Sequence, residues 1–101
     1  MDMIGALRCF IRVVETGSFT AVSRESRISQ SAVTRQIGQL EQHFKARLFH
    51  RTTRHLSLTD DGQSVLTHAL RLVDVADEME AALGRQDLAD RLSSARYIDR
   101  L

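Results

Sequence analysis

Residues 18–44 read SFTAVSRESRISQSAVTRQIGQLEQHF, and this stretch decides the fold. Its apolar residues recur at the spacing of a helical face in two blocks, which predicts a short helix followed by a longer one. We expect Ser18 or Thr20 to cap the short helix and Ser29 the longer one, because a hydroxyl oxygen there accepts a hydrogen bond from a first-turn amide. Two such helices joined by a tight link are typical of a helix-turn-helix.

The longer helix has two chemically different faces. Its apolar stripe, which we expect to be buried, consists of Val33, Ile37, Leu40 and Phe44. The opposite side carries polar side chains close to the N-terminus, namely Gln30, Ser31, Thr34 and Arg35. In a helix-turn-helix this part of the second helix enters the major groove of DNA, so residues 30–43 form the predicted recognition helix.

Further elements are predicted on both sides of this motif. Residues 2–16 form an amphipathic helix that Gly17 can end in the left-handed conformation. Residues 48–58 are apolar at both ends, which predicts a small β-hairpin, or wing, with its tip between Arg51 and Arg54. Basic side chains at a wing tip suit contact with phosphates or with the minor groove.

A long helix is predicted from Asp60 to Gly84. One of its faces repeats with alternating gaps of four and three residues, which is a heptad seam made of Val65, Ala69, Leu72, Ala76, Met79 and Leu83. A chain of this size has little surface with which to bury both sides of such a helix. The seam can meet a second chain or pack on the first helix of its own chain, and we expect both.

These elements divide the chain into three parts. Residues 1–59 are the predicted winged helix-turn-helix domain, and residues 60–84 the predicted dimerisation helix. Residues 85–101 are a charged, weakly amphipathic tail that is compatible with a further helix and has no readable role.

Composition limits the class of protein. The chain has 101 residues and no Pro, which excludes a two-domain enzyme and favours a mainly helical domain. A single cysteine excludes an internal disulfide framework and fits a reducing compartment. Because there is also no secretory signal and no apolar run of ~18 residues, the expected location is the cytoplasm, in association with the nucleoid.

The net charge of +1 conceals an asymmetry between the two halves of the chain. Residues 1–56 hold nine basic and four acidic side chains, whereas residues 57–101 hold five basic and nine acidic ones. A basic first half indicates a polyanionic partner, most simply nucleic acid. The alternative is that two solvated faces have acquired opposite charge by chance.

The ordered motifs resemble the N-terminal DNA-binding region of LysR-type transcriptional regulators over residues 3–84. The resemblance is carried by GSFTA at 17–21, SQSAVTRQIGQLE at 29–41, LF at 48–49, R-x-x-R at 51–54 and LT-x-x-G at 58–62. It implies a mainly α fold, with three helices and a short β-hairpin wing followed by a long linker helix. It also implies a homodimer, formed by pairing of linker helices, that binds an interrupted palindrome in double-stranded DNA.

The resemblance and the charge pattern together give a set of expected DNA-binding residues. The positions that match the family's DNA contacts are Gln30, Ser31, Thr34, Arg35 and Arg54, with Ser18 and Thr20 matching positions near the DNA backbone. Ser29, Lys45 and Arg51 complete the set, the last two as phosphate contacts. Lys45 also stands where the family commonly has a Gly to end the recognition helix, and a positive φ there would cost about 1 kcal/mol.

Two functions follow from these observations. The first is sequence-specific DNA binding by a dimeric transcriptional regulator module. The second is a short interaction protein that pairs through the long helix with a full-length regulator. LysR-type regulators normally continue into a ligand-binding domain, and residues 85–101 do not resemble its first strand, so no effector site is expected in this chain.

No enzyme, metal or cofactor is expected. The sequence holds neither a nucleophile elbow nor a Gly-rich phosphate loop. The four histidines also lack the i, i+4 spacing of a helical metal site.

Overall fold

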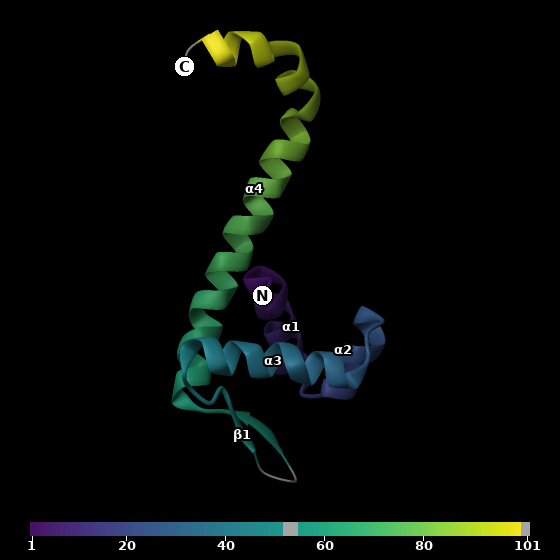
Figure 1. Ribbon diagram of the computed structural model, residues 1–101, viewed down its shortest axis with the longest axis vertical. Coiled ribbons are helices and arrows are strands. Elements are labelled where there is room, and N and C mark those ends of the chain that lie inside the picture. Colours follow the sequence, from purple (N-terminus) through teal and green to yellow (C-terminus); the bar gives the residue numbers. More distant parts are fainter. Residues whose placement is uncertain (52–54, 100–101) are drawn as a thin grey trace.

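Three short helices and a two-stranded hairpin form a base from which one long helix projects (Figure 1). The computed structural model describes residues 1–51 and 55–99, and the side chains of residues 1–51 and 55–84. The elements are α1 (Met3–Thr16), α2 (Phe19–Ser26), α3 (Gln30–Phe44), β1 (Phe49–Arg51), β2 (Leu56–Leu58) and α4 (Asp60–Asp99). The projecting helix gives the molecule a length of 59 Å against 27 Å and 20 Å in the other directions. The predicted winged helix-turn-helix fold, mainly α with a long last helix, is confirmed.

Side-chain caps begin the first three helices. Asp2 accepts the N–H of Gly5 at 3.0 Å in α1, and Ser18 and Ser29 accept first-turn amides at 3.1 Å in α2 and α3. The predicted choice between Ser18 and Thr20 as the cap of α2 is therefore settled in favour of Ser18. Each cap satisfies one amide that the helix itself leaves without a partner.

Each of the first three helices ends in a left-handed residue. Gly17 has φ 68° after α1, as its lack of a Cβ allows. Lys45 has φ 53° after α3, so the backbone does adopt there the positive φ that favours a glycine. Arg27 has φ 57° after α2, a conformation that was not predicted from the sequence. At Arg27 and Lys45 the left-handed conformation costs about 1 kcal/mol of stability each, because both residues have a Cβ. The tight turns before and after α3 require this conformation.

The core joins the wing to the helices. Phe49 of β1 is 2% exposed and its ring centroid lies 5.4 Å from that of Phe10 in α1 and 6.1 Å from that of Phe19 in α2. The described buried apolar residues are Ala6, Leu7, Cys9, Phe10, Ile11, Val13, Val22, Val33, Ile37, Leu40, Leu48, Phe49 and Ala69. Cys9 belongs to this core, and its burial raises the pKa of the thiol. A raised pKa disfavours the thiolate, which is the reactive form of cysteine.

The predicted hairpin is present and pairs antiparallel. Phe49 lies opposite Leu58, His50 opposite Ser57, and Arg51 opposite Leu56. Phe49 and Leu58 face the core while His50 and Ser57 face solvent, as the period of two requires.

Close backbone packing connects the hairpin to α4. The N–H of Thr59 donates to the Leu48 carbonyl at 3.0 Å, and the hydroxyl of Thr59 accepts the N–H of Gly62 at 2.9 Å, so Thr59 caps α4. A Cβ at Gly62 would lie 2.1 Å from the Leu48 oxygen. The Gly of the LT-x-x-G motif therefore permits close contact between the first turn of α4 and the residue that precedes β1.

Two expectations about helix residues are wrong. Phe44, predicted in the buried stripe of α3, is 41% exposed because it lines an open apolar groove with Met3 and Leu7 of α1. The long helix does not stop at Gly84 but continues to Asp99 and takes in most of the predicted tail. A glycine weakens a helix by about 1 kcal/mol without blocking it, and no Pro follows.

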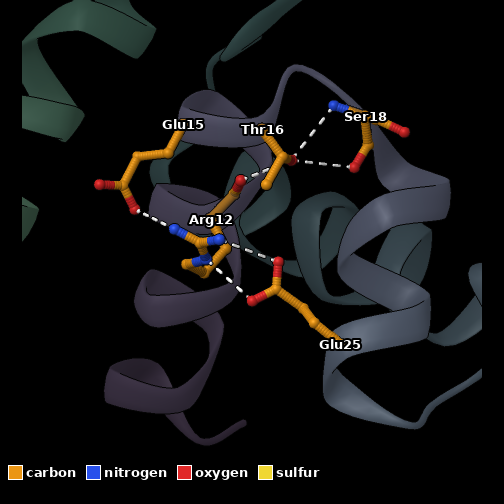
Figure 2. Close-up of polar contacts among 5 residues, drawn as sticks. All are labelled: Arg12, Glu15, Thr16, Ser18 and Glu25. Carbon is orange, nitrogen blue, oxygen red and sulfur yellow. Dashed lines mark hydrogen bonds and ion pairs between the residues drawn. The ribbon is translucent and has the colours of Figure 1, made fainter.

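Ion pairs connect α1 to α2 and to α4. The guanidinium of Arg12 donates to both oxygens of Glu25 in α2, at 3.0 and 3.1 Å, and to Glu15 at 2.9 Å (Figure 2). Its hydrogen bonds to Glu25 raise the pKa of Arg12. Arg8 pairs with Asp77 of α4 at 2.7 Å. Within residues 1–51 and 55–99, no helix has the length and apolar character needed to cross a bilayer.

Candidate nucleic-acid interface

The N-terminal half of α3 presents a polar front to solvent. Its apolar side is fixed, since Val33, Ile37 and Leu40 are fully buried. The exposed residues on the other side are Gln30, Ser31, Thr34 and Arg35. The structure thus brings together the four residues that the sequence assigns to the recognition helix.

Neighbouring hydroxyls hold the start of this polar front in place. The Thr20 hydroxyl of α2 donates to Oε1 of Gln30 at 3.2 Å. The hydroxyls of Ser29 and Ser31 lie 3.0 Å apart, and Ser29 also caps α3. Side chains that are already oriented lose less entropy when they bind a partner.

Ser18 lies at the edge of this region and has a structural task. Its half-buried hydroxyl caps α2, and its backbone N–H donates to the Thr16 hydroxyl at 3.3 Å (Figure 2). Sequence reasoning assigned Ser18 a place near the DNA backbone, and the cap itself is sufficient reason for a serine here.

The basic residues of the set differ in whether they are already paired. Arg35 and Lys45 are exposed, and no carboxylate of the described residues forms an ion pair with either. Arg51 instead pairs with Glu41 of α3 at 2.5 Å. Arg54 lies outside the described residues. The charge available to an external anion is therefore greater at Arg35 and Lys45 than at Arg51.

Sequence reasoning missed Glu41. Its side chain is 10% exposed and joins α3 to the first strand of the wing. A signal was present, because a carboxylate in the last turn of a helix opposes the helix dipole and needs a partner elsewhere. The sequence did not show which of the nearby arginines would be that partner.

The predicted seam of α4 divides into two parts. Ala69 is buried and Val65 is half-buried against α1, so these two belong to the core of their own chain. Ala69 is therefore not a free surface for a partner, contrary to that part of the prediction. Further along, Ala76 is half-buried, and Leu72, Met79 and Leu83 are 50%, 59% and 59% exposed. Val75, at 60%, lies beside Leu72 and adds to this open apolar surface.

These helices and the hairpin define a winged helix-turn-helix with a long C-terminal helix, and comparison with known proteins agrees. Residues 4–63 match the bacterial regulatory helix-turn-helix proteins of the lysR family. The chain belongs to that family.

Individual proteins named as HTH-type transcriptional regulators are also similar in sequence to this chain. The chain is 46% identical over 80 residues to the HTH-type transcriptional regulator BlaA of Streptomyces cacaoi, covering 79% of this chain and 24% of that protein. It is 37% identical over 90 residues to the probable HTH-type transcriptional regulator LtrA of Klebsiella pneumoniae, covering 88% and 29%. The chain thus spans only 24% to 29% of the length of these two relatives, whose names describe transcriptional regulators.

A solved structure matches the fold closely. The complex of the BenM DNA-binding domain with catB site 1 DNA has a TM-score of 0.76 and 32% sequence identity, covering 81% of this chain and 92% of that one.

Proposed function

We propose that this chain binds double-stranded DNA sequence-specifically and regulates transcription, with α3 in the major groove. The observation that carries the proposal is the exposed polar front of α3, which is held in place by a fully buried opposite face. The likeness to a domain solved with DNA supports it. No catalytic step is part of the proposed function.

Each residue of the polar front has a proposed role. Arg35 has the length and the bidentate donor geometry to bind the major-groove edge of guanine. Gln30, Ser31 and Thr34 complete the reading of neighbouring base pairs, and Thr20 orients Gln30. The backbone near Ser18 and Ser29 lies beside the DNA backbone, and Lys45 binds phosphate. Arg54 enters the minor groove.

We propose further that a second copy of the chain covers the open part of the α4 seam. An apolar groove of about 280 Å³ begins beside Met3, Phe44 and Leu72, where α1, α3 and α4 meet. It continues the exposed surface of Leu72, Met79 and Leu83, the proposed dimerisation residues, with Ala76 at its edge. Two copies paired through α4 would present two α3 helices to a two-fold, interrupted DNA site. The complex would act in the cytoplasm, on the nucleoid.

Selection of bound duplexes from a random pool, at two salt concentrations, tests the proposed function. We expect a two-fold motif with two conserved half-sites and an affinity that falls as salt rises, because bound phosphates release counterions. Salt-sensitive binding without any motif would contradict sequence-specific recognition.

A further inference from the structure

The carboxylate of Glu41 lies between the recognition helix and the wing. Its Oε2 accepts the backbone N–H of Leu48 at 2.8 Å, directly before β1. Its Oε1 accepts Nη2 of Arg51, within β1, at 2.5 Å. Nη1 of Arg47 lies 3.8 Å from the same Oε1. Both oxygens of a nearly buried carboxylate are therefore used on the segment that leads into the wing.

The position of Glu41 makes these contacts energetically important. A nearly buried charge is costly unless it is paired and hydrogen-bonded, and the C-terminal turn of α3 adds further repulsion. Leu48 and Arg51 supply the compensation, and hydrogen bonds to an ionised group are stronger than neutral ones. The arrangement of β1 relative to α3 is thus coupled to the charge of Glu41.

We propose that Glu41 is a positioning residue that fixes the wing against the recognition helix, and that Arg51 serves as its strut rather than as a phosphate anchor. The inference rests on the proposed function and deepens it. A wing held at a fixed distance from α3 forms its DNA contacts together with those of α3, without a separate ordering cost. Arg35 and Lys45, which lack carboxylate partners among the described residues, remain available to the DNA.

Glu41→Gln and Arg51→Gln, alone and together, test the inference. Glu41→Gln retains an acceptor for the Leu48 N–H and removes the ion pair. We expect each single variant to weaken binding of the selected duplex by about tenfold. The slope of log affinity against log salt should be the same for the two single variants. The double variant should bind no more weakly than either single variant, because both act on one interaction.

A phosphate anchor at Arg51 would behave differently. Arg51→Gln would then lower the slope of log affinity against log salt by about 0.9, while Glu41→Gln would release the guanidinium and leave binding unchanged or tighter. Either of those results overturns the inference. If Glu41→Gln does not fold, the salt dependence of Arg51→Gln decides the matter, because loss of a phosphate anchor lowers the slope of log affinity against log salt by about 0.9 and loss of a strut does not.

Glu25→Gln is the matched control. It removes a carboxylate–arginine pair of the same kind that joins α1 to α2, away from the wing (Figure 2). We expect it to lower stability slightly and to leave the affinity for the selected duplex unchanged. Wild-type protein on the same duplex separates failure of the proposed function from failure of the inference about Glu41. If the wild type does not bind, the proposed function is contradicted. If Glu41→Gln and Arg51→Gln both bind as the wild type does, only the role of Glu41 is contradicted.

Discussion

The carbonyl oxygen of Leu48 lies against the Cα of Gly62, so that a Cβ at residue 62 would be only 2.1 Å from that oxygen. This contact joins the segment leading into the wing to the first turn of α4. Because Leu48 is also held by Glu41, its backbone is shared between α3, the wing and α4.

Gly62→Ala is expected to destabilise the chain by about 1–3 kcal/mol, since backbone rather than a flexible side chain must move to make room. Gly38→Ala in α3 is the control, because a Cβ there meets nothing within 4 Å. It should stabilise the chain by up to about 1 kcal/mol through helix propensity. Thermal or urea unfolding followed by circular dichroism measures both; a neutral Gly62→Ala would mean that the junction is not tight.

Lys45→Gly is expected to stabilise the fold by about 0.5–1 kcal/mol, because φ 53° suits a glycine better than any residue with a Cβ. Gln42→Gly, within the last turn of α3, should instead be destabilising by about 1 kcal/mol. Urea unfolding distinguishes the two. Equal loss of stability in both variants would contradict a strained end to α3. Lys45→Gly should also bind DNA more weakly if Lys45 contacts a phosphate.

The sequence predicted the local features of the fold well because they depend on neighbouring residues. The caps Ser18 and Ser29 and the left-handed Gly17 follow from short-range hydrogen bonding and backbone sterics. The polar front of α3 follows in the same way from its helical period.

What the sequence could not provide depends on contacts between distant elements. Ala69 fits a heptad seam equally well whether it meets a partner or α1, and only the packing of α4 shows that it is buried. The pairing of Glu41 with Arg51 spans a turn whose path no local rule defines. The predicted end of the long helix at Gly84 is wrong, because a glycine without a following Pro weakens a helix without ending it.

Leu72→Glu is expected to disrupt dimerisation while leaving the protomer folded, because Leu72 is 50% exposed in the single chain. A charge placed in an apolar interface must be desolvated, which costs several kcal/mol. Sedimentation over a range of concentrations should show a monomer. Thr67→Glu places the same carboxylate on an exposed position of α4 outside the seam and should remain a dimer. A dimeric Leu72→Glu variant would show that α4 is not the interface.

The most direct test of the central claim compares wild type with Arg35→Ala on the selected duplex and on a scrambled duplex of the same composition. Arg71→Ala, which removes the same charge from an exposed position on α4, is the control for net charge. We expect Arg35→Ala to lose about 1–3 kcal/mol of binding free energy on the selected duplex and much less on the scrambled one. Equal losses on both duplexes, or no loss on either, would contradict sequence reading by the N-terminal half of α3.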